Sequence, residues 1–373
     1  MWRLVLVWCV LGACGFRIDT GMASDGASDT ADTPIDVEPA HWLPGYAYRK
    51  RIDVSSGQTV TLDDFAVAIV IADDADLAAH ARDDGQDIII TTQNDTILEY
   101  ELERFDGATG ALSMWARVPS LAAQQTLYMY YGGEIRMHDP RATWDANTFR
   151  AVWHMTDALG TVARDSAGQH DLASSGATNL PVLQDGIAGM GRGFDGLNDM
   201  LRDDADDNTL DFGPASFSYS VWVHVVTSAG SFDMPMFKGG SSNGTPGFDI
   251  ELGTSNWTTY AGDGTTTYPV TVASETLNTW VNIAGVVDRA NDVLIGYRDG
   301  TAKDTTDISN LGDVSSNLTF VIGSNGSNYW FRGRVDEARI YARALPPEWI
   351  AAEHATLRSP STFAAVRAEE TPP

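Results

Sequence analysis

Few residues in this 373-residue sequence have the types and spacing that catalysis requires. Its seven histidines form no His-x-x-x-His pair. The strongest candidate is Gly247-Phe248-Asp249-Ile250-Glu251, whose alternation places Asp249 and Glu251 on one face of a strand. Carboxylates two residues apart on one strand lie too close together for ordinary inverting hydrolysis, and Gly247 offers no third carboxylate on that face. We therefore predict no catalytic residue and interpret the acidic alternation as structural.

Two segments combine aromatic rings with amide side chains, as binding of a sugar requires. A sugar presents a ring face for stacking and hydroxyls for planar hydrogen-bonding groups. The candidate ligand-binding residues are Trp257 and Tyr260 in one segment, and Asn325, Asn328 and Tyr329 in the other. The alternative is that both segments are hairpin turns whose aromatic rings fold back onto a sheet.

A sixth candidate ligand contact is Trp115, which shares its strand face with the polar residues Ser113 and Arg117. An outward-facing Trp could stack on a sugar ring. The alternative is that Trp115 packs against a neighbouring loop or against a second domain.

The N-terminus has the features of an export signal. Arg3 precedes an apolar run from Leu4 to about Leu11, which is too short to span a membrane. The following Leu11-Gly12-Ala13-Cys14 resembles the bacterial lipobox, which implies cleavage before Cys14 and lipidation of its thiol. Cys9 would leave with the signal, so no intrachain disulfide could form. Residues 14–41 are polar and acidic, and we expect a disordered tether.

The rest of the chain is dominated by alternating or β-branched segments separated by turn-rich stretches. Six short strands are predicted between Tyr46 and Tyr131, with one short helix at Ala75–Ala81. A second series of strands begins near Phe149 and ends near Leu345. The expected fold class is all-β, with two antiparallel sandwich (jelly-roll) domains in tandem. The boundaries are 1–13 for the signal, 14–41 for the tether, 42–145 and 146–345 for the domains, and 346–373 for a short helix and a frayed tail.

Both domains resemble known families. Residues 42–134, with Met114-Trp115-Ala116-Arg117-Val118-Pro119 and Leu127-Tyr128-Met129-Tyr130-Tyr131-Gly132, resemble the bacterial domain-of-unknown-function family 2341. Residues 150–345, with Phe217–Val225, Thr279–Val287 and Gly333–Leu345, resemble the laminin-G-like, concanavalin A-like lectin/glucanase jelly roll. Glucanases of that fold carry Glu-x-Asp-x-Glu, so the resemblance puts Gly247 where their nucleophile stands and favours a non-catalytic role.

The second resemblance also implies a structural Ca²⁺ ion. In that superfamily the Asp of the last-strand motif binds calcium together with carbonyl groups of an early turn. Carried over to this chain, the metal ligands would be Asp336, Asp195, Gly196 and Asp165. The alternative is that Asp336 accepts hydrogen bonds from backbone N–H groups or pairs with an arginine.

Net charge and the predicted cellular location limit the possible binding partners. With 24 Lys and Arg against 51 Asp and Glu, the net charge of −27 makes nucleic acid a poor partner. We expect a protein anchored by lipid in the bacterial envelope, at the outer membrane or cell surface, that touches the membrane through its anchor only. Its expected partner is a polysaccharide or glycoconjugate. A structural or adhesion protein that binds surface proteins is the alternative, and a polysaccharide-degrading enzyme with a dispersed site is another.

Overall fold

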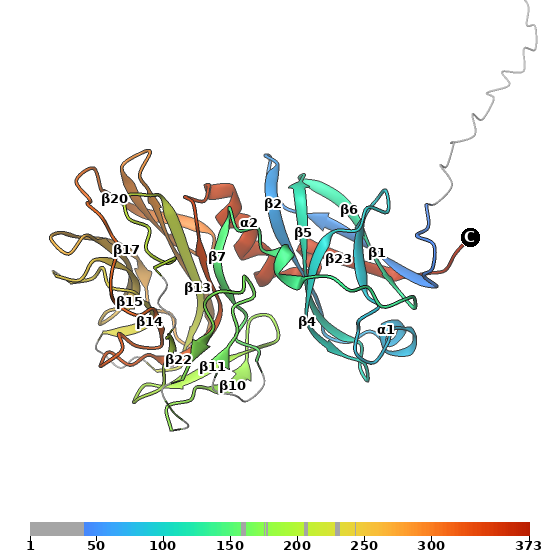
Figure 1. The fold of residues 1–373 in the computed structure, drawn as a ribbon, viewed down its shortest axis with the longest axis horizontal. Coiled ribbons are helices and arrows are strands. Elements are labelled where there is room, and N and C mark those ends of the chain that lie inside the picture. The colour runs from blue at the N-terminus through green and yellow to red at the C-terminus, as the bar shows by residue number, and fades with distance from the viewer. Residues whose placement is uncertain are drawn as a thin grey trace, which may run out of the picture. The chain divides into compact units, whose positions relative to one another are not determined.

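A computed structural model describes residues 41–373 except 158–161, 175, 177, 205–207, 228–231 and 243. The signal segment, Cys14 and the tether lie outside the described residues. His41–Pro373 forms one compact unit made almost entirely of antiparallel strands (Figure 1). In the described part of the chain, no helix is both long enough and apolar enough to cross a membrane.

The first sandwich packs a sheet of strand order β23-β1-β6-β3 against a sheet of order β2-β5-β4. All six strands predicted from sequence are present, because their alternating apolar side chains point into a shared core. The bounds are β1 (Tyr48–Ser55), β2 (Leu62–Ile71), β3 (Ile89–Thr92), β4 (Glu99–Asp106), β5 (Ala111–Leu121), β6 (Gln124–Tyr131) and β23 (Ala364–Glu370). The predicted helix is α1 (Ala75–His80), which begins where the Asp74 side chain accepts hydrogen bonds from the N–H groups of Asp76 and Leu77.

The second sandwich contains two eight-stranded sheets. The inner sheet has the order β10-β11-β22-β13-β18-β19-β20, with β7 also paired to β22; the outer sheet has the order β17-β16-β15-β14-β21-β12-β9-β8. Inner-sheet bounds are β7 (Phe149–Trp153), β10 (Val182–Asp185), β11 (Met190–Asp195), β13 (Phe217–Val225), β18 (Trp280–Asp288), β19 (Val293–Arg298), β20 (Thr301–Asp307) and β22 (Arg332–Tyr341). Outer-sheet bounds are β8 (Val162–Ala163), β9 (Leu172–Ala173), β12 (Leu201–Asp203), β14 (Asp233–Phe237), β15 (Gly247–Leu252), β16 (Asn256–Gly262), β17 (Thr267–Ser274) and β21 (Val321–Ile322).

One hydrophobic cluster extends across both sandwiches, and the second sandwich has a further core between its own two sheets. Trp222, Ala284 and Tyr341 of the inner sheet belong to the same buried cluster as the first sandwich. Helix α2 (Pro347–Arg358) contributes Trp349, whose ring lies 5.0 Å from that of Phe65 on β2. The helix begins at the Pro346-Pro347 pair, as predicted, because proline is tolerated in the first turn. Packing through a common core joins the two sandwiches into one folded body.

The expectation of a frayed C-terminal tail is wrong. After α3 (Pro360–Phe363), the chain enters β23 and pairs antiparallel with β1, from Val54 opposite Ala364 to Arg49 opposite Glu370. Glu369 and Glu370 hold the end of the strand, since their carboxylates accept from Tyr131 Oη at 2.7 Å and Arg49 Nε at 2.7 Å. The first sandwich is therefore completed by residues that follow the second.

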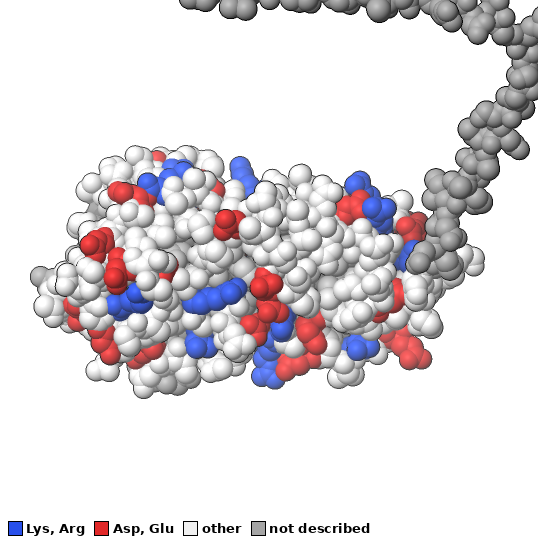
Figure 2. Space-filling model, turned by 90° about the horizontal axis from the view of Figure 1, so that it is seen from above, with Lys and Arg blue, Asp and Glu red and all other residues white. Residues whose placement is uncertain are grey.

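Charged side chains are mixed on the described part of the surface in view. In Figure 2, lysines and arginines lie among aspartates and glutamates and form no continuous basic patch on that face.

Candidate functional site

The described residues of five loops meet at one end of the second sandwich, which we call the loop end. They connect β11 to β12, β13 to β14, β15 to β16, β17 to β18, and β21 to β22. The strand register brings them together, since Asp195 pairs with Arg332, Val225 with Gly333, and Asp233 with Leu252. A bridge between Val225 and Leu277 adds the β17–β18 loop.

The loop end carries exposed apolar side chains next to amides. Nine large hydrophobic side chains stand exposed in the described part of the chain, and five of them lie here: Leu197, Val226, Phe232, Leu277 and Tyr329. The Tyr329 and Phe232 rings form an edge-to-face pair with centroids 5.6 Å apart, and they are 40% and 46% exposed. Aromatic rings open to solvent beside polar groups are a common feature of recognition surfaces.

Three predicted ligand-binding residues, Asn325, Asn328 and Tyr329, lie on the β21–β22 loop of the loop end. Asn325 Oδ1 accepts hydrogen bonds from the N–H groups of Ser327 and Asn328, which fixes the turn. Tyr329 has a φ of +54°, and its carbonyl accepts from Met234 N–H at 3.2 Å. The loop thus holds Tyr329 in a left-handed conformation with its ring beside Phe232.

The other predicted ligand-binding residues lie elsewhere. Trp257 is 0% exposed and packs into the core between the two sheets, so the expectation that it stacks on a ligand is wrong. Tyr260 lies on the opposite face of β16, paired with Asp249, and its hydroxyl is 3.5 Å from Glu251 Oε1. Burial raises the pKa of the Tyr260 phenol to about 12. The sequence places Trp257 in a loop because an amide residue precedes the aromatic ring, whereas in the structure β16 already begins at Asn256.

Trp115 is also not a ligand contact. Its side chain is 1% exposed and lies between the two sandwiches, with its ring 5.2 Å from that of His154 and 4.5 Å from the Arg339 guanidinium carbon. The indole N–H donates to Glu103 Oε2 at 2.9 Å. The alternative reading, in which Trp115 packs against the second domain, is confirmed.

The acidic alternation of β15 does not form a substrate-facing pair. Asp249 is completely buried, and burial raises the pKa of its carboxyl well above the usual range. Gly247 has a φ of +132°, and a Cβ atom there would lie 1.8 Å from the carbonyl oxygen of Lys238. No glutamate could stand at that position without displacing the backbone of the neighbouring strand end. This geometry supports the structural interpretation of the motif.

The residues predicted to bind calcium do not come together. Asp336 Oδ2 accepts from the N–H groups of Ile187 and Ala188, and Asp165 accepts from four backbone N–H groups, including those of Val152 and His170. The Asp195 side chain caps its own turn at Gly196 by accepting from Leu197 N–H. Among the described residues, these three carboxylates form no metal-binding group. Each carboxylate accepts hydrogen bonds from backbone N–H groups, which is the alternative given for Asp336.

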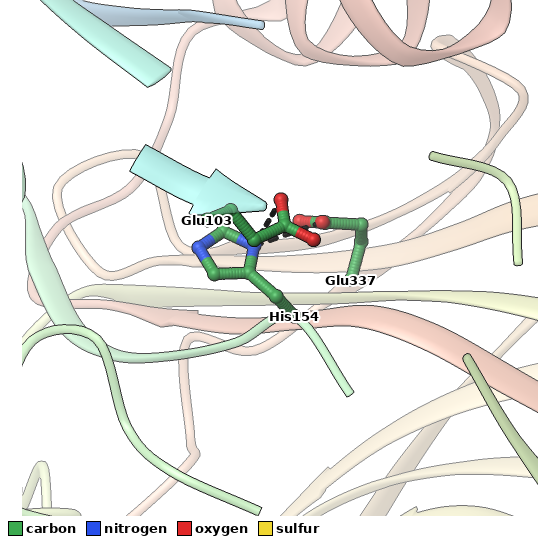
Figure 3. A group of neighbouring side chains, drawn as sticks. All are labelled: Glu103, His154 and Glu337. Carbon is green, nitrogen blue, oxygen red and sulfur yellow. Dashed lines mark hydrogen bonds and ion pairs between the residues drawn. The ribbon is translucent and has the colours of Figure 1, made fainter. Parts of the chain in front are cut away.

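A different group of ionisable side chains is buried where the two sandwiches meet (Figure 3). Glu103 comes from β4, His154 directly follows β7, and Glu337 lies on β22. His154 Nδ1 is 2.8 Å from Glu337 Oε1 and 3.8 Å from Glu103 Oε2, and one ligand atom from each residue falls within 4.8 Å of the others. We call these three residues the interface triad.

Backbone irregularities aim two of the three side chains. A β-bulge in β22 sets two residues, Glu337 and Ala338, opposite the single residue Val221 of β13, and Glu337 takes a φ of +47°. Met155, which follows His154, has a φ of +60°. Non-glycine residues in this region cost about 1–2 kcal/mol each, so the surrounding packing must enforce both.

Further polar groups surround the interface triad. Arg339 Nη2 contacts Glu337 Oε2 at 2.6 Å, and His154 Nε2 lies 3.5 Å from Glu101 Oε2. Glu101 in turn accepts hydrogen bonds from Trp144 Nε1 at 2.5 Å and Ser166 Oγ at 2.8 Å. Every carboxylate of the cluster is thereby oriented by at least one donor from a neighbouring side chain.

Burial and mutual attraction set the charges. Burial raises the pKa of Glu103 to about 7. Burial acts against the charged imidazole of His154, but the Glu337 and Glu103 carboxylates outweigh it and raise its pKa well above the usual value. The same pairing, together with Arg339, lowers the pKa of Glu337 despite burial. A strongly negative environment therefore surrounds the imidazole.

Sequence reasoning missed the two glutamates of β4. Glu99, Glu101 and Glu103 alternate with apolar residues, which is typical of the solvated face of a half-buried strand. Only Glu99 is exposed, since the second sandwich covers the other two. No local pattern in the sequence signals that covering.

Comparison with known proteins identifies the class of both sandwiches. Residues 84–150 match the family model of a domain of unknown function (DUF2341), and residues 203–351 match the concanavalin A-like lectin/glucanases superfamily. The two segments occur in the order expected from the sequence. The second sandwich is therefore a concanavalin A-like domain.

Among solved structures, the binding domain of Paraclostridial mosquitocidal protein 1 is similar, with 16% identity and a TM-score of 0.47 over 56% of this chain and 52% of that chain. The botulinum neurotoxin serotype G binding domain is also similar, with 13% identity and a TM-score of 0.45 over 55% and 50%. The aligned part thus spans about half of each of those chains. No curated protein matches this sequence.

Proposed function

We propose that this protein recognises glycans through the loop end and carries out no reaction on them. The observation that carries the proposal is the exposed pair of Tyr329, on the β21–β22 loop that also presents Asn328, with Phe232, which directly precedes β14. Rings offer a face to the C–H groups of a sugar, and amides bind its hydroxyls. The concanavalin A-like fold supports a binding role, because its strands hold these loops on a rigid frame.

The cellular setting belongs to the same proposal. A lipid on Cys14 and an acidic tether over 14–41 would hold the folded unit at the bacterial envelope, outside the cytoplasm, where polysaccharides and glycoconjugates are accessible. Cys14→Ser should then move the protein from the membrane fraction to the soluble fraction. Retention of this variant in the membrane fraction would contradict the lipid anchor.

The test uses a soluble form that begins at His41 and contains every described element. It is incubated with insoluble polysaccharides and a glycan array, with and without a calcium chelator, and the supernatants are assayed for released sugar. We expect retention without release. A loss of retention with chelator would support the calcium expectation, and release of sugar would overturn the non-catalytic role.

The matched variants are Tyr329→Asn and Phe232→Ala, with Met137→Ala as control. Asparagine tolerates the left-handed backbone of Tyr329, so the first variant removes the ring without added strain. Each ring deletion should weaken glycan binding by at least about tenfold, which corresponds to about 1.4 kcal/mol. Met137 is exposed on the first sandwich, and its loss should leave binding unchanged. Unaltered binding in both ring variants would refute the site, and binding to surface proteins instead of glycans would favour the adhesion alternative.

A further inference from the structure

We propose that Glu103, His154 and Glu337, the interface triad, bind a divalent transition-metal ion such as Zn²⁺ between the two sandwiches. The inference is independent of the proposed glycan recognition, because the triad is buried and the loop end is exposed. It rests on the positions of the ligand atoms, on the groups that orient them and on the charge they enclose.

Each member of the interface triad has one atom directed toward a common point (Figure 3). Glu103 gives Oε2 to the Trp115 indole, while its Oε1 is buried without a hydrogen-bond partner. Glu337 gives Oε2 to Arg339, while its Oε1 faces His154 Nδ1 at 2.8 Å. Ligands about 2.0–2.2 Å from a tetrahedral zinc ion lie about 3.4 Å from one another. The separations of His154 Nδ1 from Glu337 Oε1, 2.8 Å, and from Glu103 Oε2, 3.8 Å, lie on either side of that value. Rotation of the Glu103 carboxylate would present Oε1 in place of the oxygen that accepts from Trp115.

The surrounding contacts are those that metal ligands require. A metal-binding histidine usually donates its other ring N–H to a carboxylate, which fixes the tautomer and the ring plane. His154 Nε2 makes no hydrogen bond in this structure, but Glu101 Oε2 lies 3.5 Å away, and Glu101 is itself held by Trp144 and Ser166. Trp115 and Arg339 orient the two ligating carboxylates in the same way.

The charge of the cluster favours a cation. Three buried glutamate side chains, Glu103, Glu337 and Glu353, and the partly buried Glu101 share this space with two basic side chains, Arg339 and His154. A buried carboxylate without a compensating charge is costly. With the imidazole neutral, as coordination requires, a divalent ion would offset two of the carboxylates and Arg339 a third.

The donor set favours a transition metal over calcium. Calcium takes six to eight oxygen ligands on flexible turns, whereas this site offers one imidazole nitrogen and two carboxylates on sheet elements. Imidazole with carboxylate is a usual zinc set, with three protein ligands and one position left for water. Because Glu103 belongs to one sandwich and the other two ligands to the second, the ion would join the sandwiches as a disulfide would.

The experiment measures bound metal and heat stability of the full chain with Zn²⁺ alone as the probe, and with Mn²⁺ and Ca²⁺ in parallel. We expect about one Zn²⁺ per chain by elemental analysis, and a melting temperature that rises with Zn²⁺ and falls on chelation. Glu103→Gln keeps an acceptor for Trp115 and removes one ligand charge, so it should lower zinc affinity at least about tenfold and abolish the thermal response.

Glu251→Gln is the control, because it neutralises another buried glutamate of raised pKa, away from the interface, and should bind zinc like the unaltered chain. An anomalous diffraction peak between Glu103, His154 and Glu337 at the zinc edge would locate the ion directly. Absence of stoichiometric metal in the folded wild-type chain would overturn the proposal. Equal zinc binding by wild type and Glu103→Gln would do the same, since the metal would then lie on the acidic surface.

Discussion

Phe363→Ala tests whether the C-terminal segment is part of the first sandwich. Phe363 is the last residue of α3, directly before β23, and it is 3% exposed. Its ring lies 6.0 Å from that of Phe65 on β2, and α3 also packs against β1. The substitution therefore removes a buried ring from the point where the chain re-enters the first sandwich.

The expected loss follows from the burial of the whole side chain. Truncating a buried phenylalanine to alanine costs about 3–5 kcal/mol, because apolar area is lost and a cavity remains. Total unfolding free energies of domains are about 5–15 kcal/mol, so the variant should unfold at markedly lower urea concentration. A frayed tail would give a change within about 0.5 kcal/mol.

Urea unfolding gives the free energy, and hydrogen exchange shows where stability is lost. We expect the amides of Tyr48–Ser55 to exchange faster in the variant, although they lie more than 300 residues earlier in the chain. Phe232→Ala is the matched control, because that ring is exposed and its removal should cost less than about 1 kcal/mol. A change below about 1 kcal/mol in Phe363→Ala, or faster exchange confined to residues 360–373, would refute the reasoning.

Three other perturbations test the remaining structural claims. Burial raises the pKa of Asp249 in the folded state, so the favourable contribution of this carboxyl to stability is complete below about pH 4 and is lost as the pH rises toward the folded-state pKa. In urea titrations Asp249→Asn should therefore be more stable relative to wild type near pH 7 than near pH 4. An equal difference in unfolding free energy at both pH values would contradict the burial argument. Gly247→Ala should lower the unfolding free energy by about 3 kcal/mol or more, because the added Cβ would lie 1.8 Å from the Lys238 carbonyl oxygen. The control Gly253→Ala, whose added Cβ would have no atom nearer than 3.7 Å, should cost about 1 kcal/mol or less. Similar melting temperatures for the two variants would refute the steric account. A fragment of residues 41–145 should show no cooperative unfolding transition by circular dichroism, because it lacks β23 and the shared core, and a sharp transition would disprove that dependence.

Local patterns in the sequence are sufficient to predict the strands but not what covers them. The six strands of the first sandwich follow from alternation within each segment, and the proline pair before α2 marks its start. Ser113, Trp115 and Arg117 also alternate correctly, yet Trp115 is buried because the second sandwich lies on that face. Burial of this kind depends on contacts with residues far along the chain, such as His154 and Arg339, which no local window contains.

The same limit explains the two outcomes for the candidate ligand residues. Tyr329 is exposed, as predicted, because the turn fixed by Asn325 is set by neighbouring residues. Trp257 is buried because β16 continues through it, and an isolated asparagine before an aromatic residue cannot distinguish a turn from a strand start. The interface triad combines a glutamate from β4 with residues from β7 and β22, so its members are separated by about 50 and about 180 residues and leave no spacing motif.

The return of β23 to β1 also determines the order in which the protein can form. Strand β1 ends at Ser55, but its partner begins at Ala364, so the edge of the first sheet stays open until the whole second sandwich has been synthesised. An unpaired strand edge is a template for association with other chains. The growing chain therefore exposes β1 for the time needed to add some 300 further residues, and a chaperone that masks this edge would raise the yield of folded protein.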